Sequence, residues 1–261
     1  MGVALRLVAA SLFAAVPNLH QFHAPLPEGF TRADMVQRIG VDVDIANSKL
    51  KGQRVSLTKA IYSAASRSAV VPCFGTAKQK NMEGFLFPAM YAFDVRTTGA
   101  NLVANQVSAF CAAWSKLDLT YAESKNLTPY DVLEIASMVE KEAAGPSDRA
   151  KVAAVIYNRL RLGMALQIDA TLRYGLKIPP TASITQAELD SDNPYNTRKL
   201  KGLPPTPICN PGLAAMRAAA KPSTLGYLYY ARIPGTKTQK FFESYSAFEQ
   251  FLAANGYGSH P

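Results

Sequence analysis

Residues 128–163 read TPYDVLEIASMVEKEAAGPSDRAKVAAVIYNRLRLG, and this stretch predicts two helices joined by a short turn. Thr128 is a favourable N-cap, Pro129 suits the first helical position, and Asp131 completes a Thr-x-x-Asp capping box. The apolar residues of the first helix recur at helical spacing and form one stripe: Val132, Ile135, Ala136, Val139 and Ala143. Local sequence therefore determines the start of this helix well.

Two glutamates lie at the end of the first predicted helix. A helical wheel places Glu140 and Glu142 on opposite flanks of the apolar stripe, each about 80° from its centre. The Gly-Pro-Ser sequence at 145–147 breaks the helix, and a second helix ends near Gly163. A carboxylate at such a junction is partly desolvated, which raises its pKa toward that of a general acid. The alternative is two ordinary surface glutamates that flank Lys141, and periodicity does not say which of them is special.

The composition is that of a globular protein. The chain has 261 residues, enough for one large domain or two small ones, with 48% hydrophobic and 18% charged residues. This balance argues against a disordered chain. A formal net charge of +9 favours polyanionic partners such as nucleic acid, anionic lipid or an acidic cell-wall polymer. The alternative is a solvated basic surface with no dedicated partner.

The chain has three cysteines and three histidines: Cys73, Cys111, Cys209, His20, His23 and His260. The cysteines are odd in number and far apart, so their spacing fits neither a disulfide framework nor a zinc knuckle, and we expect buried or incidental thiols. The histidines lie near the termini, where a catalytic imidazole is hard to hold in place. The sequence therefore predicts no metal site and no Ser-His-Asp site.

Residues 1–26 are expected to form a separate N-terminal segment, with an uninterrupted apolar run at 7–16. The run is too short to span a bilayer, but it suits the apolar part of an export signal with Arg6 as its positive flank. No convincing cleavage site follows, and the remnant of a longer N-terminal region is an equally good interpretation.

Residues 27–70 predict a small helical lobe whose main role is packing. Thr31 and Asp34 fit a capping box at the start of a short helix. The residues expected on its apolar side are Met35, Ile39 and Val41. A second helix is expected over 56–66, opened by Ser56.

Residues 84–94, GFLFPAMYAFD, combine several aromatic side chains with Pro88, which limits regular structure. The aromatic residues are Phe85, Phe87, Tyr91 and Phe93. They must be covered, and a core or groove wall is favoured over a platform for ligand stacking. An amphipathic helix that carries the only tryptophan, Trp114, is expected over 101–116.

Residues 163–175, GMALQIDATLRYG, place the polar Gln167, Asp169 and Thr171 in alternation with apolar residues. Alternation predicts a short strand with these polar groups on one side, either lining a sugar site or forming the solvent face of an edge strand. Five prolines in 193–212 predict a rigid loop of the kind that walls a site. The remaining expected elements are a helix at 213–220, strands at 227–233 and 239–242, and a helix at 247–254.

Several uncommon strings occur in one order: EIASMVEKEA, VAAVIYNRLRLGMALQIDATLRYGL, PYNTRKLKGLPPTPICNPG and PSTLGYLYYA. Together with LPEGFTRADM and EGFLFPAMYAFD upstream, they resemble the MltG/YceG family of endolytic murein transglycosylases over most of the chain. The resemblance implies a bacterial lyase that cleaves the bond between N-acetylmuramic acid and N-acetylglucosamine within peptidoglycan strands. It also implies that the products carry 1,6-anhydromuramyl ends.

The resemblance also assigns residues. The family's essential carboxylate is the second glutamate of the Glu-Lys-Glu string, which is Glu142 here, and a single carboxyl group suits this reaction as acid and then base. The family's strings imply the following substrate-binding residues: Gln167, Asp169, Thr171, Tyr195, Asn196, Thr197, Tyr227 and Tyr229. Glu140 and Asn158 are expected as supporting residues near the turn. A purely structural role is the alternative for every residue except Glu142, and no metal or organic cofactor is implied.

The sequence departs from the family's pattern in two places. Ala170 stands where the family has a proline, and PGTKTQKFF replaces a hairpin that bears glycine and histidine, which leaves the contact geometry of that wall open. Family members usually carry a membrane-spanning helix and a small LysM-like module before the catalytic part. Neither is recognisable here, so we expect either a truncated chain or a remnant of the anchor at residues 1–16.

The resemblance places the protein in the cell envelope, at the outer face of the cytoplasmic membrane. Peptidoglycan glycan strands are the implied partner, with cell-wall synthases as further candidates, and no nucleic-acid partner is implied.

We predict an α+β fold, because the expected strands are few and lie mostly late in the chain. The predicted parts are the N-terminal segment 1–26, a helical N-terminal lobe at 27–95, and a mixed helix and strand catalytic core at 96–261. The leading hypothesis for function is a lytic transglycosylase. The others are a muramidase-type hydrolase, which needs a second carboxylate such as Asp169, and a non-catalytic basic module that binds cell wall or nucleic acid.

Overall fold

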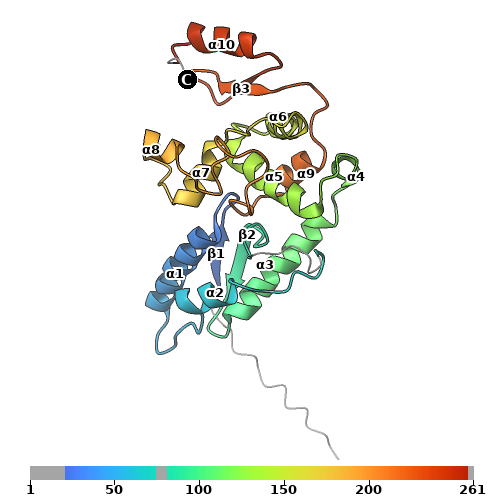
Figure 1. Ribbon diagram of the computed structural model, residues 1–261. Coiled ribbons are helices and arrows are strands. Elements are labelled where there is room, and N and C mark those ends of the chain that lie inside the picture. The colour runs from blue at the N-terminus through green and yellow to red at the C-terminus, as the bar shows by residue number, and fades with distance from the viewer. Residues whose placement is uncertain (1–20, 75–80, 258–261) are drawn as a thin grey trace, which may run out of the picture.

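The structure, a computed structural model, describes residues 21–74 and 81–257. Figure 1 shows the N-terminal elements gathered at one end of the molecule, a helical middle, and the C-terminal hairpin and last helix at the other end. This combination of helices with small antiparallel sheets confirms the predicted α+β class. The predicted apolar run at 7–16 lies outside the described residues, and within them no helix is both long and apolar enough to cross a membrane.

The N-terminal end combines a two-stranded sheet with three helices. Its elements are β1 (Phe22–Leu26), α1 (Arg32–Lys49), α2 (Lys59–Ala65), β2 (Ala89–Phe93) and α3 (Gly99–Trp114). The two strands pair antiparallel, with Phe22 opposite Phe93 and Leu26 opposite Ala89. Helix α2 contacts both α1 and α3, and α1 contacts β1, so these elements pack against one another.

Local capping explains where the helices of this lobe begin, with two corrections to the predictions. Thr31 caps α1 through the expected capping box. Thr58 caps α2, so the expected start at Ser56 is wrong. Val41 is 55% exposed, which contradicts its predicted place on the apolar side. It lies two residues after the buried Ile39, about 200° around the helix, and therefore faces the opposite way.

The middle of the molecule is built on the predicted pair of helices, α5 (Pro129–Glu142) and α6 (Arg149–Arg161). Thr128 closes the expected capping box with Asp131, and both helix ends agree with the predicted breaks. Almost every residue between Tyr130 and Val139 is buried. Helix α5 packs against α6 and against α9 (Leu213–Ala220), while the short α4 (Thr120–Glu123) precedes it. The central position of α5 holds its C-terminal end firmly in place.

The expected strand at 163–175 is wrong, because Asp169–Leu176 forms helix α7, followed by the short α8 (Gln186–Leu189). Ile168 and Leu172 are both buried and lie four residues apart, which is helical spacing. The Thr171 hydroxyl donates to the Ile168 carbonyl at 2.7 Å within the first turn. The strand prediction relied on an alternation of only three polar residues, and it overlooked the helical spacing of Ile168 and Leu172.

The Pro-rich stretch 193–212 forms an irregular loop, as predicted, and Asn210 fixes its far end. Asn210 is fully buried. Its Oδ1 accepts from Gly84 N at 3.0 Å and from Leu86 N at 2.9 Å, and its Nδ2 donates to the Phe30 carbonyl at 2.9 Å. The loop is therefore attached to the N-terminal lobe through backbone groups.

The C-terminal end is a hairpin followed by a helix: β3 (Tyr229–Arg232), β4 (Gln239–Phe242) and α10 (Tyr245–Ala254). The strands pair antiparallel, with Tyr229 opposite Phe242 and Tyr230 opposite Phe241. These elements confirm the predicted order, and their bounds differ from the expected ones by two residues at most.

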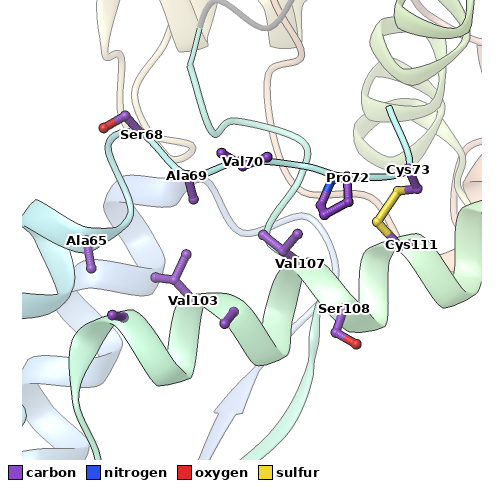
Figure 2. A pocket seen from close by; sticks show the side chains of 12 residues that line it. Ala65, Ser68, Ala69, Val70, Pro72, Cys73, Val103, Val107, Ser108 and Cys111 are labelled. Atoms are coloured by element: carbon purple, nitrogen blue, oxygen red, sulfur yellow. A yellow bond between two sulfur atoms is a disulfide. The ribbon is translucent and has the colours of Figure 1, made fainter. Parts of the chain in front are cut away.

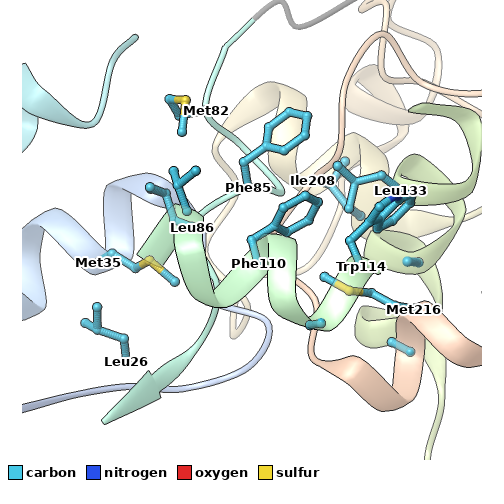
Figure 3. Packing of buried hydrophobic residues seen from close by; sticks show 14 of the residues in the cluster. Leu26, Met35, Met82, Phe85, Leu86, Phe110, Trp114, Leu133, Ile208 and Met216 are labelled. Atoms are coloured by element: carbon cyan, nitrogen blue, oxygen red, sulfur yellow. The ribbon is translucent and has the colours of Figure 1, made fainter. Parts of the chain in front are cut away.

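One buried aromatic cluster lies where the lobe meets the middle helices. Figure 3 shows Phe85, Phe110 and Trp114 packed together, with Leu133 and Met216 beside them. The rings of Phe85 and Phe110 are fully buried with centroids 5.1 Å apart, and burying such a side chain contributes about 2–3 kcal/mol. The core interpretation of the aromatic stretch 84–94 is thus confirmed. The cluster contains residues from both sides of residue 95, the predicted boundary between the N-terminal lobe and the catalytic core. That boundary stays a prediction.

Cys73 and Cys111 form a disulfide with Cα atoms 5.5 Å apart, so the expectation of unpaired thiols is wrong for this pair. Sequence spacing does not reveal which distant residues a fold brings together. Figure 2 shows the bond linking the chain after α2 to helix α3, beside an apolar hollow of about 790 Å³. Cys209 is a buried free thiol, as expected.

Candidate active site

Glu142 is the last residue of α5, and two residues of the C-terminal hairpin hold it. The Tyr230 hydroxyl donates to Glu142 Oε2 at 2.8 Å. Gln239 Nε2 donates to the Glu142 carbonyl at 3.0 Å, and Gln239 Oε1 accepts from Ala144 N at 3.2 Å. The hairpin therefore fixes the backbone at the end of the helix as well as the carboxyl group.

The surroundings of Glu142 favour its protonated form. Burial raises the pKa of Glu142 above its ordinary value, and the nearby Asp169 carboxylate acts in the same direction. The Tyr230 hydroxyl, the Ala170 N–H and the Arg198 guanidinium act in the opposite direction, since each stabilises the ionised form. A raised pKa keeps more of the carboxyl group protonated near neutral pH, as a general acid requires.

The carboxyl group of Glu140 binds a different part of the chain from that of Glu142. Its Oε2 accepts from Gly212 N at 3.0 Å, and Gly212 is the N-cap of α9. Burial raises the pKa of Glu140 as well, with a further contribution from Glu28, so the direction of the pKa shift does not separate the two glutamates. The contacts do separate them, because the Glu140 carboxyl fastens α5 to the start of α9.

A polar cleft of about 940 Å³ lies beside the start of α7. Its lining comes from α7, α8 and the chain around them: Gln167, Asp169, Arg173, Ser183, Ile184, Gln186, Leu189, Asp190, Arg198 and Lys199. Asp169 Oδ1 lies 2.6 Å from Arg198 Nε in an ion pair. Because Asp169 and Arg198 also act on the pKa of Glu142, the cleft and the glutamate belong to one site.

The described residues 21–74 and 81–257 contain no group of three or more histidine, cysteine, aspartate or glutamate side chains that could hold a metal ion. The groups that act on the pKa of Glu142 include one carboxylate, that of Asp169, one guanidinium, that of Arg198, and the Tyr230 hydroxyl. What this arrangement can do chemically is move a proton to and from Glu142.

Three of the predicted substrate-binding residues are enclosed by protein. Thr171 and Asn196 have no exposed surface, and Thr197 is 2% exposed. The hydroxyl oxygens of Thr171 and Thr197 lie 2.9 Å apart, and Ile168 N donates to Thr197 Oγ1 at 3.1 Å. Asn196 Nδ2 donates to two carbonyl groups near α8, each at 2.8 Å. In this conformation these side chains support the wall of the cleft and do not reach its surface.

Comparison with known proteins places this arrangement in a family. The model of the YceG-like family matches residues 4–254 of the chain. The chain belongs to the YceG-like family. The resemblance that the sequence strings carry is thereby confirmed.

Curated relatives of this YceG-like chain are named endolytic murein transglycosylases. The relative from Bacillus subtilis is 32% identical over 178 residues, which are 66% of this chain and 49% of that protein. A relative from Streptococcus pneumoniae is 30% identical over 220 residues, which are 78% of this chain and 39% of that protein. The chain thus spans half or less of the length of these relatives. A solved YceG-like protein from Listeria monocytogenes matches with a TM-score of 0.70 and 28% identity, covering 88% of this chain and 75% of that one.

The predicted tyrosines of the YceG-like chain make their described contacts with other protein groups. The rings of Tyr227 and Tyr229 pack against Phe241 and Phe248, with centroids 5.4 and 5.3 Å apart. Tyr195 is half-buried in the Pro-rich loop, where its hydroxyl makes a 2.8 Å hydrogen bond. None of these three rings has a described contact with Glu142, so their role in substrate binding stays a prediction.

Two further predicted residues brace the site. Asn158 Nδ2 donates to the carbonyls of Leu225 and Tyr227, both at 3.0 Å, which ties α6 to the chain before β3. Gln167 lines the cleft, and its Oε1 accepts from Arg159 Nη1 at 3.1 Å. Support of the turn after α5 by Asn158 stays a prediction, because its described partners lie before β3.

Sequence reasoning missed three side chains at this site: Tyr230, Arg198 and Gln239. Successive residues of a strand point to opposite faces, so the alternation in YLYY offered two possible faces. The family's strings assigned Tyr227 and Tyr229, whereas their neighbour Tyr230 is the residue that meets Glu142. The partners of Arg198 and Gln239 lie far away in the sequence, where no local pattern could indicate them.

Proposed function

We propose that the chain is an endolytic peptidoglycan lytic transglycosylase that cleaves the bond between N-acetylmuramic acid and N-acetylglucosamine within glycan strands. The observation that carries this proposal is Glu142, a carboxyl group of raised pKa that is bound by Tyr230 and is acted on by Asp169 and Arg198, two residues that line a polar cleft. The names of the curated relatives support murein as the substrate.

One carboxyl group serves both halves of the proposed reaction. Protonated Glu142 donates its proton to the glycosidic oxygen as the bond from that oxygen to C1 of the muramic acid breaks. The resulting carboxylate takes the proton of the muramyl O6 hydroxyl as O6 bonds to C1. The product carries a 1,6-anhydromuramyl end, Glu142 is protonated again, and no water is consumed. Tyr230 donates to the carboxylate between the two steps and stabilises it.

The cleft is the proposed binding site for the glycan strand. Asp169 and Gln167 offer acceptors for hydroxyl and acetamido N–H groups, and the cations of the lining suit the carboxylates of peptidoglycan peptides. Each of Arg173 and Arg198 donates through one nitrogen in its described side-chain contacts, which leaves further N–H groups for a ligand. In this proposal Thr171, Asn196 and Thr197 keep the wall in shape, and Tyr195, Tyr227 and Tyr229 remain candidate contacts for sugar faces: their exposure is partial.

The proposed location is the cell envelope, at the outer face of the cytoplasmic membrane, where the substrate lies. The disulfide between Cys73 and Cys111 supports this location, since such bonds persist in oxidising compartments outside the cytoplasm. Cell-wall synthases as partners stay a prediction.

Tyr230→Phe is expected to lower kcat about tenfold, because a hydrogen bond to a charged group contributes about 1.5–3 kcal/mol. The lost hydroxyl stabilises the ionised form of Glu142, so the pKa of Glu142 rises further. The alkaline limb of kcat therefore moves to higher pH. The measurement is kcat against pH on purified glycan strands, with Tyr245→Phe, an exposed tyrosine of α10, as control. A limb that stays in place would contradict the role of Tyr230.

The reaction class is tested by digestion of purified peptidoglycan and mass spectrometry of the fragments. Anhydromuramyl ends on internal fragments are the expected result. Reducing ends would favour the muramidase-type hydrolase, with Asp169 holding a water beside Glu142. No cleavage would favour the third hypothesis, a non-catalytic basic module. If that module binds nucleic acid, its affinity would weaken steeply as the salt concentration rises.

A further inference from the structure

Glu83 is a buried carboxyl group that the proposed reaction does not use, and it joins three separate parts of the fold. It is 4% exposed. Its Oε1 accepts from Arg32 N at 2.9 Å and from Asn210 Nδ2 at 3.0 Å, and its Oε2 accepts from the Tyr174 hydroxyl at 3.0 Å. Helix α1, the Pro-rich loop and helix α7 therefore meet on this one side chain.

One set of contacts leads from Glu83 through α7 to the active site. Tyr174 lies about one turn after Ala170 in this helix. The first turn of α7 presents the Ala170 N–H and the Asp169 carboxylate to Glu142. A helix this short moves as one piece, so a displacement at Tyr174 also displaces the groups that face the carboxyl group.

A second set of contacts leads from Glu83 through the Pro-rich loop to α5. Asn210 is two residues before Gly212, whose N–H donates to Glu140 Oε2 at 3.0 Å. Gly29 N donates to the Asn210 carbonyl at 3.0 Å, and Lys141 Nζ donates to the Gly29 carbonyl at 3.2 Å. Both sets of contacts therefore end on the last turn of α5.

We propose that Glu83 is a positioning residue for the reaction at Glu142, and the inference rests on the proposed function. It holds α7 against α1 and the Pro-rich loop, so that the Ala170 N–H and Asp169 keep their places beside the catalytic carboxyl group. Because the Glu83 side chain is enclosed, it acts through Tyr174 and Asn210 and not by touching substrate.

The groups around Glu83 require a hydrogen-bond acceptor, and a buried carboxylate in this place lowers the stability of the folded chain. Three donors converge on the carboxyl group, and Arg32 N belongs to the first residue of α1, where the helix dipole favours negative charge. Burial nevertheless raises the pKa of Glu83 to about 7. The other charged or titratable groups that face it are Arg32, Asp34, Tyr62, Tyr130, Tyr174 and Cys209. A carboxyl group that destabilises the folded chain as it ionises fits a residue retained for function.

Glu83→Gln separates positioning from packing. We expect kcat at pH 8 to fall about tenfold with KM within about twofold, because the hydrogen bonds to an ionised carboxylate become weaker neutral ones and the Tyr174 hydroxyl must turn to accept from the amide N–H. The folded-state pKa of about 7 lies above the ordinary 4.5, so the wild-type chain loses stability as pH rises through this range. Glutamine does not titrate, and the Tm of the variant relative to wild type is therefore higher at pH 8 than at pH 5. A residue that served packing alone would lose activity and stability together.

Tyr174→Phe breaks the same connection from the other side. Its kcat is expected to fall by a similar factor. The double variant with Glu83→Gln is expected to show no further loss, since both changes remove the same donation from the Tyr174 hydroxyl to Glu83. Asp42→Asn is the matched control. Asp42 is a carboxylate only 8% exposed, and its partner Arg38 lies on the same helix, so this variant is expected to keep the wild-type kcat.

Hydrogen exchange of the amides in α7 gives a readout that needs no activity. Glu83→Gln is expected to speed exchange at residues 170–176 and to leave exchange in α6 unchanged. Unchanged exchange in α7, or a wild-type kcat in Glu83→Gln, overturns the positioning role. A wild-type chain that does not cleave murein overturns the proposed function instead, and the exchange data then decide whether Glu83 holds α7.

Discussion

Glu142→Gln is expected to reduce kcat for murein cleavage about 10³-fold, which corresponds to about 4 kcal/mol of activation free energy. The amide has nearly the same shape and still accepts the Tyr230 hydrogen bond, but it neither gives up nor takes a proton at neutral pH. Because one group is both acid and base in the proposed reaction, neither step has a substitute. KM is expected to change little, since the loss is confined to the chemical step.

Glu140→Gln is the matched control for this variant. Glu140 lies two residues away on the same helix and has a pKa raised by burial, but its carboxyl group binds Gly212 N. The variant is expected to keep most of its kcat. Release of fragments from purified peptidoglycan measures both variants. Full activity in Glu142→Gln together with loss in Glu140→Gln would reverse the assignment.

The stability of Glu142→Gln separates lost chemistry from lost folding. The pKa of Glu142 is higher in the folded chain than its ordinary 4.5, so its contribution to stability is present below that value and is lost as pH rises through the folded-state pKa. The neutral amide avoids this loss. The Tm of Glu142→Gln relative to wild type is therefore expected to be higher at pH 8 than at pH 5, although the activity is gone.

The helix pair around Glu142 could be predicted from the sequence because its determinants are local. Thr128 and Asp131 cap the first helix within one turn, and the Gly-Pro-Ser break at 145–147 lies directly beside its end. Such determinants act between residues a few positions apart, where sequence patterns are most informative. The same holds for α9 and β4, whose bounds match the predicted ones.

Long-range pairing is what the sequence could not predict. Pro88 argued against regular structure in residues 84–94, yet β2 begins directly after it, and its partner strand β1 itself contains Pro25, opposite Met90. The sheet has only two strands, so each is an edge strand, and an edge position tolerates a proline. Nothing in the sequence near β1 indicates that its partner lies beyond α1 and α2.

In the candidate site, too, local patterns predicted some features, and the long-range contacts could be seen only in the fold. Helical periodicity placed both glutamates at the flanks of the stripe, and both are half-buried in the structure. Family likeness assigned Glu142, and the structure adds a difference in contacts: Glu142 meets Tyr230, whereas Glu140 meets Gly212. Tyr230 lies 88 residues away from Glu142 in the chain, so its role could emerge only from the fold.

Replacing both Cys73 and Cys111 by serine is expected to lower the free energy of unfolding by about 4 kcal/mol. The two cysteines are 38 residues apart, and the loss of loop-closure entropy for a loop of this length accounts for that amount. The bond also holds Phe74, whose ring packs against Phe85 and Trp114 in the aromatic cluster. Urea unfolding followed by the fluorescence of Trp114 measures the change.

A reductant tests the same bond without mutation. Dithiothreitol is expected to destabilise the wild-type chain by about the same amount and to leave the double variant unchanged, since the variant's remaining cysteine, Cys209, is unpaired. Thiol titration of the unreduced, denatured chain is expected to find one free thiol. Three free thiols, or an unfolding free energy that reductant does not change, would contradict the disulfide. Because such bonds persist in oxidising compartments, one free thiol in protein isolated from the cell envelope would also support the proposed location.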